Sequence, residues 1–248
     1  MANHLIIKNV NEKLNTHGFG QYKLNFICGN DVLHFGHPTG ILKIIHRKPV
    51  KGRDYSTADI DSIIELIDRY DLVFSLTELS VSRLKELGPR VNFEIGYFSF
   101  CKGACYNYIR KTIYLNPSRI FRRWNMHFKN SIDLSHFITI LILHELGHVL
   151  QDQEQPRITR LKQFVSGFNH FRVSNQDAEK YKHFLMHEEK DAWDRCEKYL
   201  CGTTIAPSSF SKIKAYCLST YATLELTRVK ANLKALFHDV HLKKGLLE

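Results

Sequence analysis

The chain has 248 residues, of which 44% are hydrophobic and 24% are charged, as in an ordinary folded protein. These proportions exclude disorder or a coiled coil as a description of the whole chain. The 35 basic residues outnumber the 25 acidic ones, and the resulting net charge of +10 suits acidic partners such as nucleic acid or an anionic surface.

The first part of the chain predicts short strands and helices. Residues 20–28 and 41–47 predict two strands, separated by a loop that is rich in Gly and Pro. Residues 58–69 predict a helix, because their isoleucines recur on one face. A second helix is expected over 80–87, where Gly88-Pro89 would end it.

Two further strands are expected before the longest apolar stretch. Apolar residues alternate over 91–97 and again towards 109–115, and the loop CKGACYN between them predicts a hairpin. Residues 133–152 predict a long, almost wholly apolar helix, which Pro156 prevents from running much further.

The last third of the chain predicts helices. We expect a basic, irregular connection over 156–173 and then a helix over 175–200, capped by Ser174 and stopped near Gly202. A final helical region over roughly 208–237 is expected to break once. Strands first and helices last indicate an α+β protein with a strand-rich N-terminal part and a helical C-terminal part.

The sequence also bears on cellular location. The apolar run at 5–7 is too short for the core of a secretory signal, and the stretch at 137–143 is far below the about 18 residues of a membrane span. We therefore expect a soluble, cytoplasmic protein without a membrane span, with signal-independent translocation into a host cell as an alternative. Six cysteines do not form a disulfide scaffold, so free thiols are expected.

The motif HELGH at 144–148 carries the clearest chemistry. His144 and His148 are four residues apart, so on a helix they share one face and can bind one metal ion. Glu145 lies about 100° around the helix and can instead take a proton from a metal-bound water. Gly147 in a helix interior predicts that another backbone comes close there. The alternative is a core helix whose histidines have ordinary partners.

A catalytic zinc site needs a third protein ligand, and the sequence offers several. Glu154 would follow the metzincin layout, in which a glycine turns the chain, but Gln151 occupies the glycine position. A distant histidine, His183 or His187, is a second source. The third is Glu189, whose neighbours three and four residues away are all apolar. An ionised carboxylate in a buried stripe is costly without a cation, which favours Glu189 over the adjacent Glu188.

HELGH at 144–148, followed by EKDAW at 189–193, resembles the gluzincin branch of the zincin metallopeptidases. The resemblance covers roughly 91–200 and extends to IRKTIYLNP at 109–117, which looks like the strand that binds an extended peptide substrate. It departs at Trp193, where the family often has an acidic residue that orients a histidine ligand.

The resemblance implies a zincin-like domain over 76–248, with an upper sheet and active-site helix at 76–155 and a lower helical part at 156–248. Residues 1–75 would form a strand and helix segment of unknown role. It also implies a zinc (Zn2+) endopeptidase that acts on a protein or peptide substrate.

In such an enzyme His144, His148 and Glu189 would hold the metal, and Glu145 would be the general base. Gluzincins often add a Tyr or His that stabilises the oxyanion. The sequence leaves open which residue does so, among Tyr181, His183, Tyr199 and Tyr216.

Basic residues leave a rival function open. One group spans 119–129 with aromatic residues between its arginines, and another includes Arg157, Arg160 and Lys162. Such loops suit nucleic acid or an acidic partner, so the rival is a nucleic-acid-associated zincin-like protein that acts on DNA-bound proteins or is catalytically silent. A third possibility is a helical binding protein with an accidental HExxH. The pair Cys101 and Cys105 is half of a metal site or, more simply, two loop thiols.

Overall fold

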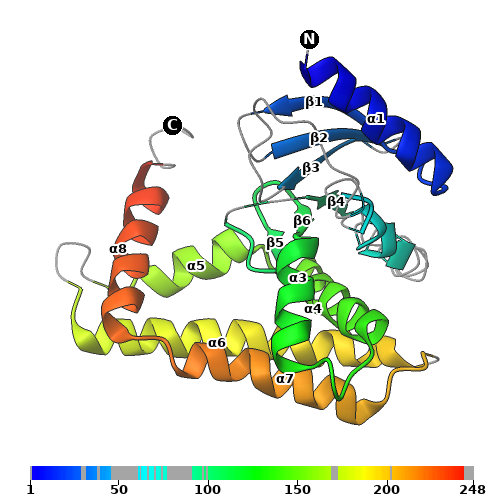
Figure 1. The fold of residues 1–248 in the computed structure, drawn as a ribbon. Coiled ribbons are helices and arrows are strands. Elements are labelled where there is room, and N and C mark those ends of the chain that lie inside the picture. Colours follow the sequence, from blue (N-terminus) through cyan, green and yellow to red (C-terminus); the bar gives the residue numbers. More distant parts are fainter. Residues whose placement is uncertain are drawn as a thin grey trace. The chain divides into compact units, whose positions relative to one another are not determined.

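A computed structural model shows a mixed α+β protein, which confirms the predicted fold class (Figure 1). The structure describes residues 2–28, 32–37, 40–45, 61, 63–65, 67–69, 71–73, 75–76, 91–96, 98, 100–168, 173–201 and 203–242. The chain divides into two compact units. One comprises Met1–Glu86, Asn92–Cys105 and Thr112–Ile138, and the other Leu87–Val91, Tyr106–Lys111 and Thr139–Glu248.

The first unit begins with α1 (Ala2–Thr16) and an antiparallel sheet in the order β1-β2-β3, formed by Lys23–Cys28, Val32–His37 and Gly40–Ile45. The prediction of two strands joined by a loop was therefore incomplete, because β2 lies inside the predicted loop. Gly36 interrupts the apolar alternation of β2, so the sequence pattern did not predict this strand, although Phe35 is fully buried.

Apolar residues from α1 and this sheet form a core with a helical segment. The described residues between 61 and 76 are helical, which confirms the predicted helix and extends it past residue 69. Ile63 and Ile67 are fully buried, as their spacing predicts, and join Val10, Leu14, Tyr22, Leu24 and Phe35. The helix predicted over 80–87 lies outside the described residues.

A second sheet has the order β4-β6-β5, formed by Asn92–Ile95, Thr112–Leu115 and Ala104–Asn107. The predicted hairpin between the first and last of these segments was wrong, because β4 and β6 are parallel, with Asn92 opposite Thr112. Part of the supposed loop forms β5, the other neighbour of β6. Ala104 and Asn107 have low strand propensity, so the local sequence gives little sign of a strand.

The basic group at 119–129 lies mainly on a helix, α3 (Pro117–His127), rather than in the loop expected there. Asn116 caps it by accepting a hydrogen bond from the backbone N–H of Arg119, and Pro117 occupies the first turn. The indole of Trp124 donates to the carbonyl of Ile132 and so ties the helix to the segment that follows.

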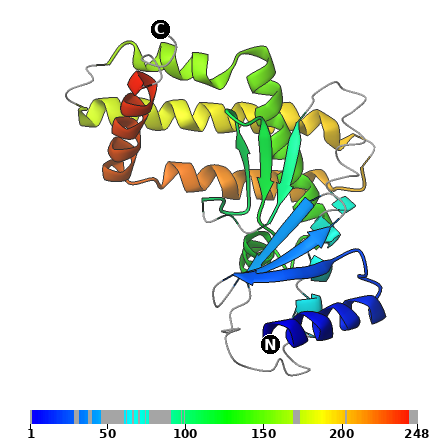
Figure 2. The ribbon, with the colours of Figure 1, turned by 90° about the horizontal axis from the view of Figure 1, so that it is seen from above.

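The second unit is helical. It contains most of α4 (Leu134–Glu154), then α5 (Arg157–Val165), α6 (Asn175–Glu197), the short 3-10 helix η1 (Lys198–Leu200), α7 (Pro207–Ala222) and α8 (Leu226–Leu242). Both ribbon views show α6 running alongside α7, and α6 also contacts α8 (Figure 2).

Three of the helical predictions are confirmed. The apolar helix, the helix capped by Ser174, which forms a capping box with Asp177, and the broken final pair all form. The irregular connection over 156–173 was wrong in part, because α5 begins directly after Pro156. A proline that ends one helix can also precede the next, and Leu161 and Val165 provide α5 with a buried face.

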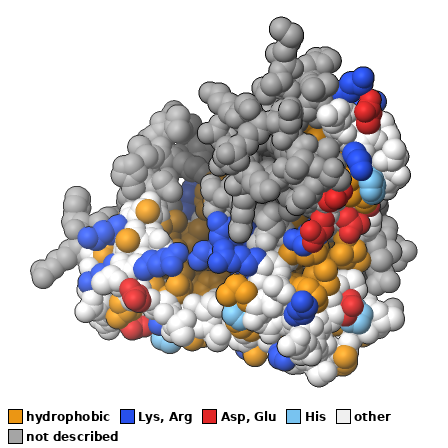
Figure 3. Space-filling view, in the orientation of Figure 1, with side chains coloured by type: hydrophobic (Ala, Val, Ile, Leu, Met, Phe, Trp, Pro, Cys, Tyr) orange, Lys and Arg blue, Asp and Glu red, His pale blue; other side chains and the backbone are white. Residues whose placement is uncertain are grey.

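Basic side chains gather on one face of the molecule (Figure 3). Lys and Arg side chains form a band over the region where Figure 1 draws α5 (Figure 3). Lys162 is exposed, whereas Arg157 and Arg160 are partly buried. Within the described ranges, no helix is both long enough and apolar enough to cross a membrane.

Candidate metal centre

Helix α4 places the three polar residues of HELGH in a buried position. The exposed fractions of His144, Glu145 and His148 are 6%, 6% and 8%, and the two imidazole centroids lie 4.7 Å apart. This follows from the four-residue spacing, which puts both rings on one face of the helix. Burial of three polar groups on an apolar helix requires partners from elsewhere.

Helix α6 supplies that partner as Glu189. Its two carboxylate oxygens lie 3.2 Å from His144 Nε2 and 3.5 Å from His148 Nε2. One ligand atom from each of the three residues falls within 4.8 Å of the others, and all three are buried, so the group could hold a metal ion. Within the described part of the chain it is the only such group.

A close approach of α4 and α6 makes this geometry possible. A Cβ atom on Gly147 would overlap the carbonyl oxygen of Ala192, which lies on α6 close to Glu189. The prediction that another backbone comes close to Gly147 is therefore confirmed. Any larger residue would push α6 away and carry Glu189 with it.

Charge couples the three residues of this group. Burial tends to raise the pKa of Glu189, but the charges and hydrogen bonds of His148 and His144 hold that pKa well below its usual range. Burial tends to lower the pKa of His148, and the carboxylates of Glu189 and Glu145 reverse this and raise it. The same carboxylate that attracts the two imidazoles could therefore neutralise a bound cation.

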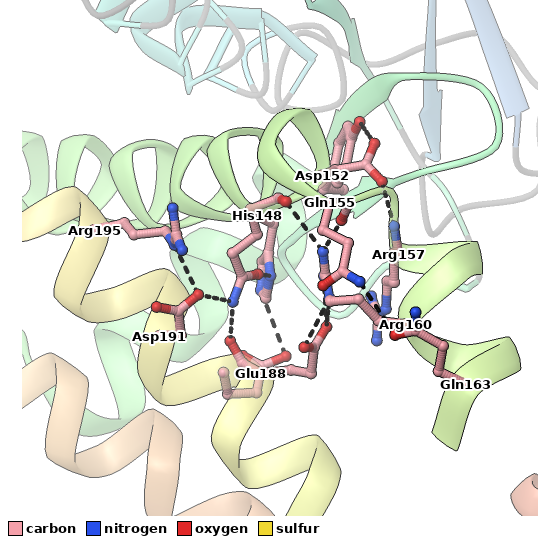
Figure 4. A network of polar contacts seen from close by, with 12 residues as sticks. His148, Asp152, Gln155, Arg157, Arg160, Gln163, Glu188, Asp191 and Arg195 are labelled. Carbon is pink, nitrogen blue, oxygen red and sulfur yellow. Dashed lines mark hydrogen bonds and ion pairs between the residues drawn. The ribbon is translucent and has the colours of Figure 1, made fainter. Parts of the chain in front are cut away.

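The second histidine of the motif is held through its other nitrogen. His148 Nδ1 lies 2.9 Å from Gln151 Oε1, one turn further along α4. Gln151 is 3% exposed, and its Nε2 donates to the Glu188 carbonyl at 2.7 Å and to Asp191 Oδ2 at 2.8 Å. Figure 4 shows His148, Asp191 and Arg195 in this network.

The first histidine is held differently. The ring of His144 stacks on the indole of Trp193, with centroids 4.1 Å apart and an interplanar angle of 15°. Neither His144 Nδ1 nor Trp193 Nε1 has a hydrogen-bond partner among the residues that the structure describes. Trp193, at the position where the resembled family often has an acidic residue, thus provides a flat aromatic contact to His144.

The other candidate ligands face away from the two imidazoles. Glu188 forms an ion pair with Arg160, at 2.6 Å. Glu154, the ligand of the metzincin layout, has a side chain that is 67% exposed and pairs with Arg195. His183 and His187 are both exposed. Of the sequence candidates, the structure brings Glu189 alone into contact with both histidines.

One tyrosine at the site was missed by sequence reasoning. Tyr221, near the end of α7, forms a side-chain hydrogen bond with Glu189, and burial and this negative charge raise the pKa of its phenol. Among the four residues proposed for the oxyanion role, Tyr181 lies in the hydrophobic core of α5, α6 and α8, and Tyr199 lies under the Lys198 ammonium. Nothing in the local sequence around Tyr221 distinguishes it from other tyrosines. Only the position of α7 in the fold brings it to the site.

Neither Cys101 nor Cys105 belongs to a group of metal-ligating side chains in the described part of the chain. The buried Cys101 sulfur contacts the backbone carbonyls of Gly103 and Tyr114.

No protein-family model, curated protein or solved structure matches the chain. Its function is therefore inferred from the chemistry of the buried centre.

Proposed function

We propose that the protein is a zinc-dependent metallopeptidase of gluzincin type that hydrolyses peptide bonds of a protein or peptide substrate. The observation that carries the proposal is the buried group of His144, His148 and Glu189, with Glu145 on α4, the helix of both histidines. A two-imidazole, one-carboxylate donor set leaves a fourth position open, which is the arrangement of catalytic zinc sites.

The donor set favours zinc over harder metal ions. Magnesium and calcium prefer oxygen ligands in octahedral or larger coordination shells, whereas imidazole nitrogens suit zinc. When bound, zinc supplies Lewis acidity that lowers the pKa of a coordinated water to about 7.

Glu145 is the residue that we assign to proton transfer. It is buried, it acts electrostatically on both His148 and Tyr221, and it does not belong to the metal-binding group. A carboxylate in that position can accept the proton of the attacking water and then pass it to the leaving amine. Its burial keeps that proton away from bulk solvent between the two steps.

Tyr221 is the residue that we assign to oxyanion stabilisation. Its raised pKa keeps the phenol protonated at neutral pH, so that it remains a hydrogen-bond donor. That hydroxyl forms a hydrogen bond with Glu189. When the carboxylate is bound to a metal, the hydroxyl can turn towards the oxygen of the tetrahedral intermediate.

A second candidate function is association with nucleic acid. The observation in its favour is α3, on which Arg119 and Arg122 are exposed, with exposed Lys129 just beyond the end of the helix. Binding through these residues would be to phosphate groups, so the affinity would fall steeply as salt is added.

The test of the peptidase proposal is metal content followed by activity. We expect about one zinc ion per chain in the wild type, a greatly reduced content in Glu189→Ala, and an unchanged content in Glu154→Ala. Peptidase activity should then be screened with the wild type and with Glu145→Gln, which should bind zinc and be inactive. A wild type that takes up no zinc when zinc is supplied would rule out the proposal.

A further inference from the structure

We propose that Gln151 is the positioning residue of His148 and that Asp191, on α6, acts on the metal centre through Gln151. This inference rests on the proposed metal-binding function and adds to it the residues that orient one ligand. The two side chains are called the relay below.

Hydrogen-bond accounting fixes the orientation of the Gln151 amide. Its nitrogen faces the Glu188 carbonyl at 2.7 Å and Asp191 Oδ2 at 2.8 Å, and both of these oxygens can only accept. Both N–H groups are thus used, and the amide oxygen is the atom that faces His148 Nδ1, at 2.9 Å. A flipped amide would place a carbonyl oxygen against a carbonyl and a carboxylate.

The fixed amide in turn fixes the tautomer of His148. An amide oxygen only accepts, so Nδ1 must carry the proton. The lone pair of the neutral imidazole then lies on Nε2, the atom that faces Glu189 at 3.5 Å. This is the nitrogen that belongs to the metal-binding group, so the relay presents His148 in its ligating form.

Further ion pairs hold Asp191, the outer residue of the relay, in place. Asp191 Oδ2 accepts from Arg195 Nε at 2.7 Å, and Arg195 pairs with Glu154 at 2.6 Å. Gln151 is 3% exposed, so water has little access to replace a lost partner. The chain of contacts joins α4 to α6 at the level of the metal-binding group and holds the ring of His148 in one position.

A neutral amide between the carboxylate and the imidazole has a chemical consequence. A carboxylate in direct contact with a ligand histidine raises the basicity of that ligand. Here the Asp191 carboxylate is one side chain further away, and the ring of His144 is held by an aromatic stack, its Nδ1 having no hydrogen-bond partner among the described residues. The centre thus orients both rings without a carboxylate in direct contact with either Nδ1 atom.

Zinc affinity in a set of matched variants tests the relay. Gln151→Met keeps similar volume and removes the amide, so its zinc affinity should fall about 10- to 100-fold. Gln155→Met is the control, because Gln155 lies one turn further along the chain and bonds to Gln163 at the surface. Its affinity should be that of the wild type. Affinities are measured by competition with a chromophoric zinc chelator.

The double variant Gln151→Glu/Asp191→Asn exchanges the amide and the carboxylate. The new Glu can accept from His148 and from the new Asn, which keeps both contacts of the relay and gives up only the hydrogen bond to the Glu188 carbonyl. We expect this variant to bind zinc within about tenfold of the wild type. It also keeps the proposal falsifiable if Gln151→Met does not fold.

A spectroscopic readout separates positioning from packing. The His148 Nδ1 proton should be visible in nitrogen-15 spectra of the zinc-loaded wild type and protected from exchange by Gln151. In Gln151→Met it should exchange faster while the remaining spectrum is unchanged.

The relay proposal would be overturned if Gln151→Met bound zinc with wild-type affinity, or if the double variant bound zinc as poorly as Gln151→Met. Either result would leave the proposed zinc site intact. Absence of zinc binding in every variant and in the wild type would instead refute the proposed function, and the relay with it.

Discussion

Tyr221 and Glu189 share a hydrogen bond, and this contact gives the first prediction at the scale of single residues. Tyr221→Phe removes one hydroxyl from the site and leaves the ring in place. If the phenol donates to the oxyanion, kcat should fall about 100-fold, as expected when one oxyanion donor is removed. Steady-state kinetics on any cleaved peptide would show this.

Zinc affinity serves as the control for Tyr221→Phe. Because the tyrosine is not a member of the metal-binding group, the variant should retain its zinc. An unchanged kcat would show that another residue stabilises the oxyanion. Loss of zinc would show that the hydroxyl supports Glu189 instead.

Some residues of the centre could be predicted from the sequence because their partners are local. His144, Glu145 and His148 lie on one helix, and helical geometry alone sets their relation. Glu189 could be predicted because an acidic residue in an apolar stripe requires a cation. Tyr221 could not, because its partner Glu189 lies on another helix. Gln151 lies one turn from His148, but the contacts that orient its amide come from Glu188 and Asp191 on α6, and no local pattern records them.

At the scale of elements, Asp152 anchors a turn to the end of α4. Its side chain is buried, and it accepts hydrogen bonds from the Tyr106 hydroxyl at 2.8 Å and the Arg157 backbone N–H at 2.7 Å, besides its ion pair with Lys111. Three segments, the turn at 106–111, α4 and the start of α5, therefore meet at one carboxylate.

Asp152→Ala should lower the free energy of unfolding by about 1–3 kcal/mol, because it leaves two partly buried donors without an acceptor. Lys111→Met should cost less, since that side chain is 54% exposed and its ion pair is partly solvated. Urea denaturation of both variants measures the difference. Equal losses would mean that the ion pair, and not the buried hydrogen bonds, holds the turn.

The same carboxylate contributes to the pH dependence of stability. Burial tends to raise the pKa of Asp152, and Lys111 and the other donors outweigh this and hold it below the ordinary value of 3.8. Because the folded-state pKa is depressed, the contribution is present above pH 3.8 and is lost as pH falls through the lower, folded-state value. The stability gap between the wild type and Asp152→Ala should therefore narrow in acid.

Element by element, the sequence was most informative where one segment contains its own signal. The long apolar helix α4 and the capped helix α6 have complete patterns, and Gly147 indicated where they meet. β2 and β5 were missed because glycine or weak strand formers interrupt them, and their stability comes from neighbouring strands. The parallel pairing of β4 and β6 was also missed. The relative direction of two strands depends on the path of the chain between them, which the pattern of each strand does not record.

At the scale of the whole molecule, the metal-binding residues all belong to one of the two compact units. His144, His148 and Glu189 lie within Thr139–Glu248, whereas α1 and the sheet β1-β2-β3 lie within Met1–Glu86. The α+β class followed from the order of elements, but this division did not, because the second unit also includes Tyr106–Lys111 from between two strands. A segment this short has no change in composition that would mark a boundary between units.

This division predicts where zinc stabilises the protein. A free zinc concentration of 100 times the dissociation constant stabilises the folded state by about 2.7 kcal/mol. The proposed ligands connect α4 with α6. Hydrogen exchange with and without zinc should therefore show slower exchange of backbone amides in α4 and α6 and little change in α1 and β1-β2-β3. Glu189→Ala should show no zinc effect in either region. Equal protection of both units would mean that they unfold as one cooperative body, and protection confined to the first would place the zinc elsewhere.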